Sequence, residues 1–397
     1  MTSEVLAPPT LSLGPAAWLR KNLFSTWASS LATVATSALL TWLVVLIAQW
    51  AVTAARWGVV TTNLKLFLVG QYPATELWRI WLMLALVSLL AGLSARVFGR
   101  ATRTLATWLA AAQLLLAGLA AVSEVGFMIP LALVVNAAIV AVAFVAAALR
   151  TPGRRPLVLA WLASVPVSFL LLSGIGTGAL PSVGSGQWGG LLLTILIAVV
   201  GILLSFPFGV LLALGRRSSL PAVRALSTAY IELIRGVPLV TILFMADIML
   251  PLFLPGEVRI DRVARAMGGV TLFSAAYVAE NVRGGLQAIP IGQVEAANAL
   301  GLSGVQTNLF IVLPQALRSV IPANVGLFIS LLKDTTLVTI IGLSELLGIG
   351  RSVLGQSQWF GAHLEVYIFI GGVFFVLCFM MSQASYRLEE ALGVGKR

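Results

Sequence analysis

The chain has 397 residues, of which 59% are apolar and only 10% are charged, and its mean hydropathy is +1.01. This composition lies far outside the range of soluble globular proteins, and several apolar runs reach the roughly 20 residues that a membrane-spanning helix needs. It therefore predicts an all-α integral membrane protein. The net charge of +11 does not indicate a nucleic-acid partner, because the basic residues form short clusters between apolar runs, as they do in cytoplasmic loops.

About ten transmembrane helices are expected from the apolar windows that lie between charged residues, glycines and prolines. The first five are predicted at residues 30–50, 76–98, 102–122, 128–149 and 155–176, and the other five at 189–214, 228–254, 266–288, 319–345 and 365–386. A Gly/Pro/Ser-rich stretch from Gly174 to Gly190 separates the two groups. We expect four parts: a tail (1–29), a transmembrane extension (30–186), a helical core (187–390) and a second tail (391–397).

The distribution of basic residues predicts the orientation of these helices. If the N-terminus is cytoplasmic, 17 of the 25 Lys and Arg residues fall on the cytoplasmic side and seven on the outer side, while Lys333 falls within a helix. Because cytoplasmic loops carry the excess of positive charge, both termini are predicted to be cytoplasmic. The segment 290–318, between the eighth and ninth helices, is then cytoplasmic as well.

This cytoplasmic segment is unusually polar for the chain. The sequence IPIGQVEAANALG predicts a short helix that begins after Pro290 and ends at Gly301. Ser303 to Gln306 (SGVQ) fit a capping box, and Pro314 is expected to start another helix. The residues alone thus predict two short helices set at an angle. They leave open a simple hairpin that lies on the lipid headgroups.

The spacing of seven residues in this segment resembles the EAA loop of ATP-binding-cassette (ABC) importer permeases. They are Glu295, Ala296, Ala297, Gly301, Ile311, Leu313 and Pro314. Three further stretches are similar to the polar amino-acid permeases: YIELIRGVPLVTILF (230–244), AAYVAENVRGGLQAIPIGQVEAANALGL (275–302) and SLLKDTTLVTIIGLSEL (330–346). The five additional N-terminal helices, with RWGVVTTNLKLFLVGQYP (56–73) between the first two, are similar to the general L-amino-acid permease branch of bacteria.

The resemblance implies a fold, a function and partners. The core would be a type I ABC importer permease whose EAA loop (290–318) couples to a cytoplasmic ABC ATPase dimer, which binds ATP and Mg²⁺. A periplasmic amino-acid-binding protein would deliver L-amino acids, and a second homologous permease subunit would supply the other half of the translocation path. The chain would lie in the bacterial inner membrane.

This chain itself is expected to be neither an enzyme nor a cofactor-binding protein. Its glycine-rich stretches lack the Gly-Lys-Ser/Thr ending of a nucleotide-binding loop. Cys378 lies within an apolar run and His363 at the start of the last one. One cysteine and one histidine cannot build a disulfide framework or a Cys/His metal site. We therefore expect no metal and no catalytic residue.

Five ionisable residues in or beside the predicted helices are candidates for the translocation path or its gate, because a charge at membrane depth needs a partner or water. Lys333 and Asp334 either anchor the helix bundle or meet the zwitterionic ends of an amino acid. Glu280 and Arg283, at i and i+3, form either a local ion pair or part of an inner gate. Asp247 lies late in its helix, where a solvated carboxylate at the outer rim is expected rather than a substrate ligand.

An ion-coupled secondary transporter of small polar solutes is the alternative function. The sequence offers little for it, since it has no inverted pair of broken helices and no chain of intramembrane acids and histidines for proton relay.

Overall fold

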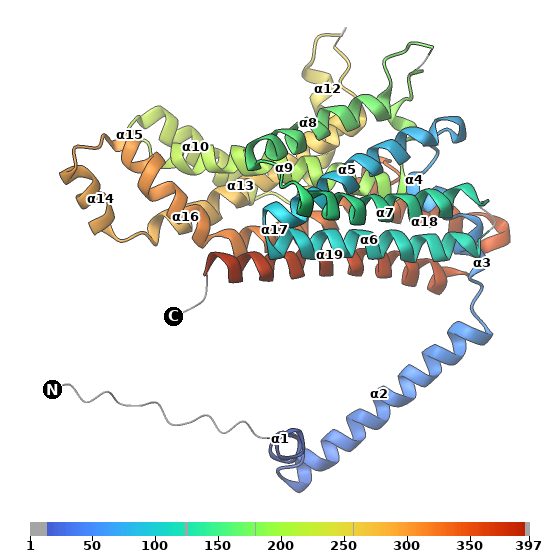
Figure 1. Cartoon of the computed structure of the whole chain (residues 1–397). Helices are drawn as coiled ribbons and strands as arrows, with labels where there is room; N and C mark the ends of the chain where they lie inside the picture. Colours follow the sequence, from blue (N-terminus) through green and yellow to red (C-terminus); the bar gives the residue numbers. More distant parts are fainter. Residues whose placement is uncertain (1–13, 124–125, 179, 257, 394–397) are drawn as a thin grey trace. The chain divides into compact units, whose positions relative to one another are not determined.

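The computed structural model describes residues 14–123, 126–178, 180–256 and 258–393. The secondary structure of these residues is helical apart from two isolated β-bridges. The chain divides into two compact units, Met1–Arg56 and Trp57–Arg397 (Figure 1). Among the described residues, eight helices are long and apolar enough to cross a membrane, or nine if a bent pair counts as one span. The prediction of an all-α membrane protein is confirmed.

The first unit contains α1 (Pro15–Asn22) and α2 (Trp27–Thr53). A capping box starts α2, because the Thr26 hydroxyl accepts a hydrogen bond from the Ser29 amide at 3.2 Å and the Ser29 hydroxyl accepts one from the Thr26 amide at 2.9 Å. This helix is the first predicted span. Of the predicted tail 1–29, residues 1–13 lie outside the described part of the chain.

Four of the predicted spans form a bundle in the first part of the second unit. They are α5 (Leu77–Val97), α6 (Arg100–Ala121), α7 (Met128–Leu149) and α8 (Arg154–Ser173), preceded by α3 (Gly58–Thr62), α4 (Leu64–Val69) and the 3₁₀ turn η1 (Ala74–Glu76). In α5, a Cβ at Gly92 would meet the Val140 carbonyl oxygen of α7, so the two backbones pack without space for a side chain. Polar contacts add to the packing, since Gln113 donates to Ser88 at 2.9 Å.

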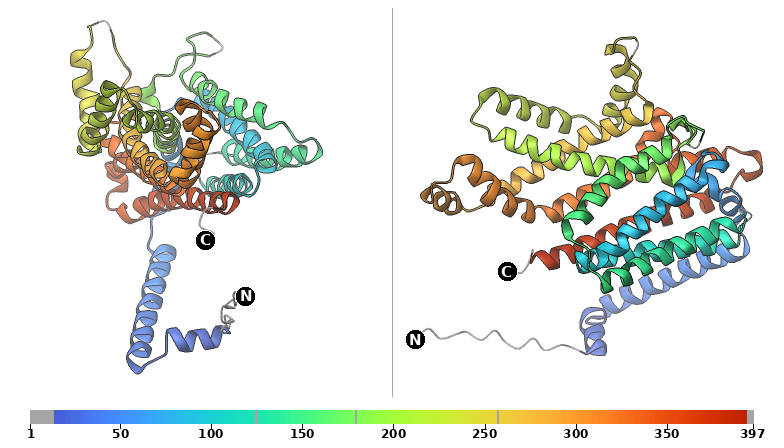
Figure 2. Two further views of the ribbon diagram at one scale, coloured as in Figure 1. Left: turned by 90° about the vertical axis from the view of Figure 1, so that its left-hand side faces the viewer. Right: turned by 45° about the horizontal axis from the view of Figure 1, so that its top comes forward.

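The remaining long helices form the C-terminal core of the second unit. They are α9 (Gly190–Arg216), α13 (Arg262–Gln287), α17 (Ile321–Asp334), which continues as the 3₁₀ helix η5 (Thr335–Ile341), and α19 (His363–Leu392). The helices α9 and α13 pack closely, because a Cβ at Gly209 would lie 2.5 Å from the Val278 side chain. Figure 2 shows α13 enclosed by neighbouring helices. Its interior position explains why α13 is less apolar than the spans around it.

The seventh predicted span, 228–254, consists of two helical segments joined by a sharp bend at residues 236–238. The chain forms α10 (Pro221–Arg235) and then a second helical segment over 239–253, which is bent by 108° from α10. The second segment consists of α11 (Leu239–Phe244), the π-helix η3 (Met245–Met249) and α12 (Leu250–Phe253). Pro238 ends the first helix because it has no amide hydrogen and disfavours helical geometry in the residue before it.

Glycines join the N-terminal helices of this unit to the core. Gly70 ends α4 at φ +64°, and a Cβ there would lie 2.5 Å from the Cα atom of Gly189. Gly190, at φ +60°, begins α9, and its amide donates to the Ser344 carbonyl at 2.9 Å. Only residues without a Cβ permit these approaches. The short elements nearby are η2 (Ser185–Gln187), α18 (Leu346–Leu354) and η6 (Ser357–Trp359).

A buried arginine reinforces the same junction. The Arg79 side chain is fully buried, pairs with Glu76 at 2.7 Å and donates to the Pro181 carbonyl at 2.9 Å. The Tyr72 hydroxyl donates to the Leu172 carbonyl at 3.0 Å. The predicted division at residue 186 therefore lies within one compact unit, although it separates two groups of helices in the sequence.

Candidate functional site

The polar segment that the sequence singled out forms a helical hairpin. Its first arm is α14 (Ile291–Ala299), and its second arm runs through α15 (Gly304–Gln306), the π-helix η4 (Thr307–Val312) and α16 (Leu313–Ser319). We call residues 290–319 the coupling hairpin. It extends from the end of the second unit at which α19 ends, opposite to the end that contains α3 and α18 (Figure 1).

The turn of the hairpin is held by the residues that predicted it. Gly301 ends α14 with φ +76°, and the Leu302 amide donates back to the Ala297 carbonyl at 3.1 Å. The Ser303 hydroxyl accepts from the Gln306 amide at 3.3 Å, while the Gln306 side chain accepts from the Ser303 amide at 2.9 Å. The predicted glycine end and capping box are both confirmed.

Pro314 lies in the first turn of α16, where the sequence predicts a helix start, but no break separates α16 from the turns before it. The second arm is helical from Gly304 to Ser319 without interruption, with Pro314 in the first turn of α16. A proline inside an α-helix removes one hydrogen bond and its ring clashes with the carbonyl four residues earlier. The π-helical turns just before Pro314 widen the backbone ladder at this point, which accommodates the ring without a break.

The seven EAA positions divide between the inside and the surface of the hairpin. Ala297 is buried between the arms, where Thr307 and Val312 are also buried, and Ile311 and Leu313 are half-buried. Gly301 supplies the left-handed turn. In contrast, Glu295, Ala296 and Pro314 are exposed. The surface beside them is apolar, since Leu300, Val305 and Phe310 are 82%, 68% and 68% exposed.

A close helix crossing fixes the base of the hairpin to the membrane helices. A Cβ at Gly285 of α13 would lie 2.5 Å from the Val320 side chain and 2.8 Å from the Ala316 carbonyl oxygen. Ala316, Val320 and Leu286 belong to one buried apolar cluster. The base of the hairpin is therefore in close backbone contact with α13.

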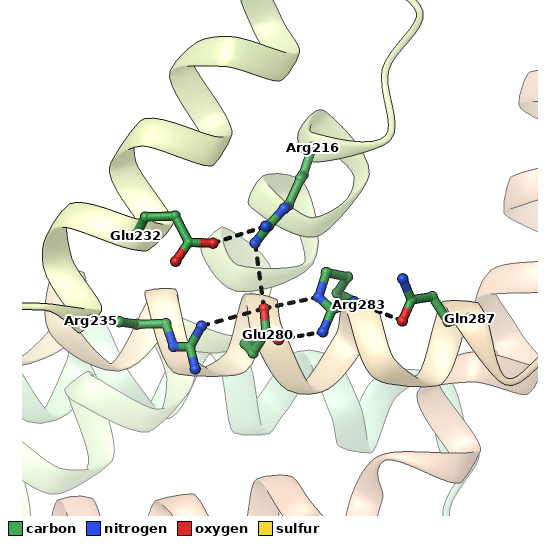
Figure 3. Close-up of polar contacts among 6 residues, drawn as sticks. All are labelled: Arg216, Glu232, Arg235, Glu280, Arg283 and Gln287. Carbon is green, nitrogen blue, oxygen red and sulfur yellow. Dashed lines mark hydrogen bonds and ion pairs between the residues drawn. The ribbon is translucent and has the colours of Figure 1, made fainter.

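Next to this base, Glu280 of α13 lies at the centre of a charged cluster (Figure 3). The Arg283 Nε atom donates to Glu280 Oε2 at 3.0 Å, which confirms the local pair as one of the two interpretations of their spacing. Arg216 of α9 and Arg235 of α10 also pair with Glu280, at 3.5 and 3.6 Å. Glu232 of α10 binds Arg216 at 2.8 Å. The cluster thus ties three helices together.

Sequence reasoning did not find the roles of Arg216 and Arg235. They lie 64 and 45 positions from Glu280, and no spacing rule links residues so far apart. The available signal was topological, because the predicted orientation places the ends of all three helices on the cytoplasmic side.

Asp247 is not the solvated carboxylate that was expected. Its side chain is 10% exposed and lies 3.2 Å from both Arg262 and Arg265, and Arg265 also donates to the Asp247 carbonyl. The bend after α10 brings the π-helical segment onto the first turn of α13, which pairs the two arginines with the carboxylate.

Lys333 and Asp334 lie at the end of α17, where the helix changes to 3₁₀ geometry. Lys333 is exposed and Asp334 is half-buried. Within the described ranges, no ion pair joins them to each other or to the Glu280 cluster. Their role in the path stays a prediction.

Glu345 is a structural residue that the sequence did not reveal. It is fully buried beyond the end of the α17–η5 span, and its carboxylate accepts from the amides of Leu347 and Gly348 at 2.8 Å each, and from the Thr339 hydroxyl. These bonds cap α18, and burial raises the pKa of the Glu345 carboxyl. Ser, Thr, Asp and Asn are the usual capping residues, so a glutamate at this position did not indicate the role.

The helical bundle and the coupling hairpin define a multi-pass membrane permease, and comparison with known proteins identifies its kind. Residues 205–392 match the family described as "Binding-protein-dependent transport system inner membrane component". The chain is 37% identical over 394 residues to "Inner membrane amino-acid ABC transporter permease protein YhdY" of Escherichia coli (strain K12). This alignment covers 96% of this chain and 93% of the relative.

Two more relatives show the same kinship. "Glutamate/glutamine/aspartate/asparagine transport system permease protein BztC" of Rhodobacter capsulatus is 39% identical over 431 residues, covering 98% of this chain and 97% of the relative. "Probable glutamine ABC transporter permease protein GlnP" of Bacillus subtilis is 37% identical over 202 residues, covering 51% of this chain and 91% of the relative.

The chain belongs to the amino-acid ABC transporter permeases of this binding-protein-dependent family. It is the permease subunit of an amino-acid ABC importer in the inner membrane. Permeases of this family bind no cofactor and are not ATPases, so a separate ATPase and a binding protein are its partners. The family decides against the ion-coupled secondary transporter.

Proposed function

We propose that this chain forms half of a translocation path for L-amino acids, and that a second homologous permease subunit forms the other half. An ABC ATPase dimer docks on the coupling hairpin at the cytoplasmic face, and a periplasmic amino-acid-binding protein delivers substrate at the opposite face. Both chain termini are cytoplasmic. The architecture comprises the N-terminal extension (30–186) and the permease core (187–390).

The observation that carries the proposal is the geometry of the coupling hairpin. Its caps and buried Ala297 make it a preformed element, while Glu295 and Ala296 lie on its surface beside exposed apolar side chains. The small side chain of Ala296 permits a close approach by another protein. The contact of Gly285 with α16 then transmits a displacement of the hairpin to α13.

We assign the role of an inner gate to the Glu280 cluster. Its ion pairs join α9, α10 and α13 at the same end of the bundle as the hairpin (Figure 3). A shift of α13 relative to the other two helices exchanges these pairs, which gives the two discrete arrangements that an ATP-driven transition requires. Arg283 and Glu280 move together because they lie on the same helix.

The bent segment α11–η3–α12 supports a permease partner. Ile248, Leu252 and Phe253 are 56%, 78% and 77% exposed, and the last part of the segment, α12, projects from the bundle (Figure 1). A second permease core would pack against this apolar arm. We assign Lys333 and Asp334 to the path between the two subunits, and Asp247 to the support of the arm at its outer end.

A charge reversal on the hairpin tests the proposal. Glu295→Lys is expected to abolish ATP-driven amino-acid uptake by the reconstituted importer, while the abundance of the chain and basal ATP hydrolysis are retained. Glu390→Lys is the matched control, because it reverses an exposed carboxylate near the cytoplasmic end of α19, outside the hairpin. Uptake at the wild-type rate by Glu295→Lys would refute the docking role.

The path assignment has its own test. Lys333→Met and Asp334→Asn are expected to alter uptake kinetics more than assembly with the partner subunits. Unchanged kinetics for every L-amino acid tested would remove both residues from the path.

A further inference from the structure

A small basic pocket lies beside the Glu280 cluster, at the ends of α9 and α13. It has a volume of about 320 Å³ and is lined by Arg216, Arg217, Arg283 and Gln287. The end of α13 leads directly into the coupling hairpin, which begins at Pro290. The pocket therefore occupies the junction between the membrane helices and the hairpin.

The charges around this pocket are not balanced. The pocket and the adjoining cluster contain four arginines and two glutamates, so positive charges exceed negative charges by two. The residues are Arg216, Arg217, Arg235, Arg283, Glu232 and Glu280. Both carboxylates are already engaged by the other three arginines. Arg217 donates to the Leu286 carbonyl oxygen at 3.3 Å, and among the described residues it forms no ion pair with a carboxylate.

Donors at the pocket remain available for an anion. A guanidinium carries five N–H groups in a rigid fork, and Arg217 uses one of them in its bond to Leu286. The Gln287 oxygen accepts from Arg283 at 2.7 Å, which fixes the amide so that its NH₂ group is left to donate. A fork and an amide fit the several oxygens of a phosphate group.

We propose that this pocket binds the phosphate group of an anionic ligand, with Arg217 as its main contact. Basic pockets between membrane helices on the cytoplasmic side attract the phosphate headgroups of anionic lipids. Exposed apolar side chains that could contact acyl chains follow Arg217 in the sequence, since Leu220 before α10 and Leu226 within it are 62% and 73% exposed. A free phosphate ion has the same chemistry and is the second source of the ligand.

Occupancy would stabilise the base of the coupling hairpin. A phosphate group bound by Arg217 at the end of α9 and by Gln287 at the end of α13 would hold these two helix ends together. The hairpin packs on the same part of α13, at Gly285. The inference goes beyond the proposed function, and it is tested by binding to the full chain rather than by transport, so the two fail independently.

The test is native mass spectrometry of the full chain in detergent micelles containing phosphatidylglycerol or phosphatidylcholine. We expect preferential retention of phosphatidylglycerol and about tenfold weaker retention by Arg217→Gln, as for the loss of one charged hydrogen bond. Arg224→Gln is the control, because Arg224 is an exposed arginine near the start of α10 that does not line the pocket. Gln287→Leu provides a second variant if Arg217→Gln folds poorly.

A second arm measures thermal unfolding of the same proteins with inorganic phosphate. Stabilisation by phosphate that depends on Arg217, without a preference between the two lipids, would support the pocket and identify a soluble ion as its ligand. The proposal is overturned if neither probe shows dependence on Arg217, or if Arg224→Gln weakens binding as much as Arg217→Gln does.

Discussion

The adjacent glycines Gly284 and Gly285 allow a stringent test of how the hairpin is coupled to the membrane helices. A Cβ at Gly285 would lie 2.5 Å from Val320 Cγ1 and 2.8 Å from the Ala316 carbonyl oxygen, whereas a Cβ at Gly284 has no neighbour within 4 Å. Both glycines lie in the same helix, α13. Alanine at the two positions therefore makes the same chemical change with and without a clash.

The magnitudes follow from these contacts. Replacing a glycine in a helix by alanine stabilises it by about 1 kcal/mol, because alanine loses less backbone entropy. Overpacking of a tight contact costs about 1–3 kcal/mol, and here one of the opposing atoms belongs to the backbone of α16, which cannot rotate away. Gly285→Ala should thus be less stable than Gly284→Ala by about 1–3 kcal/mol.

The assay compares the two variants in the assembled importer. At one heating rate, Gly285→Ala is expected to unfold at a lower temperature than Gly284→Ala and to hydrolyse more ATP per amino acid transported, since α16 is displaced from α13. Gly284→Ala should match the wild type in coupling. Equal unfolding temperatures and equal coupling ratios for the two variants would refute the reasoning.

Two further predictions use matched pairs. Glu280→Gln should destabilise the chain by about 1–3 kcal/mol, because three arginines lose their shared carboxylate. Glu232→Gln should destabilise it less, because the Glu232 side chain is more exposed. Thermal unfolding of both variants measures the difference. Gly189→Ala places a Cβ 2.9 Å from the Ser344 carbonyl oxygen and should increase proteolysis at the junction of the two helix groups, whereas Gly186→Ala, with open space around it, should not. The opposite order within either pair would contradict the packing described.

Local signals in the sequence were sufficient for much of the fold and for the hairpin. Apolar windows located the spans, and Gly301 and the Ser303–Gln306 box set the hairpin turn, because both depend on residues within four positions of one another. The bend after Arg235 was not predicted as a change of direction. A proline indicates that a helix is interrupted, but the angle of 108° is set by the helices that pack around it.

The charged partners could not be predicted for a related reason. The contacts of Glu280 with Arg216 and Arg235, and of Asp247 with Arg262, join different helices, and their geometry depends on how those helices cross. At Pro314 the local rule located the start of α16, but it did not predict the π-helical turns that join α16 to the preceding residues without a break.

Cysteine crosslinking from the coupling hairpin in native membranes tests the central claim most directly. In a Cys378→Ser background, Ala296→Cys places a thiol on the exposed face of α14, while Ala297→Cys places it at a buried position one residue away. The account predicts that the first variant captures the partner ATPase in an ATP-dependent manner and that the second captures far less. Capture of lipid or of this chain alone by Ala296→Cys, with no ATPase, would contradict it.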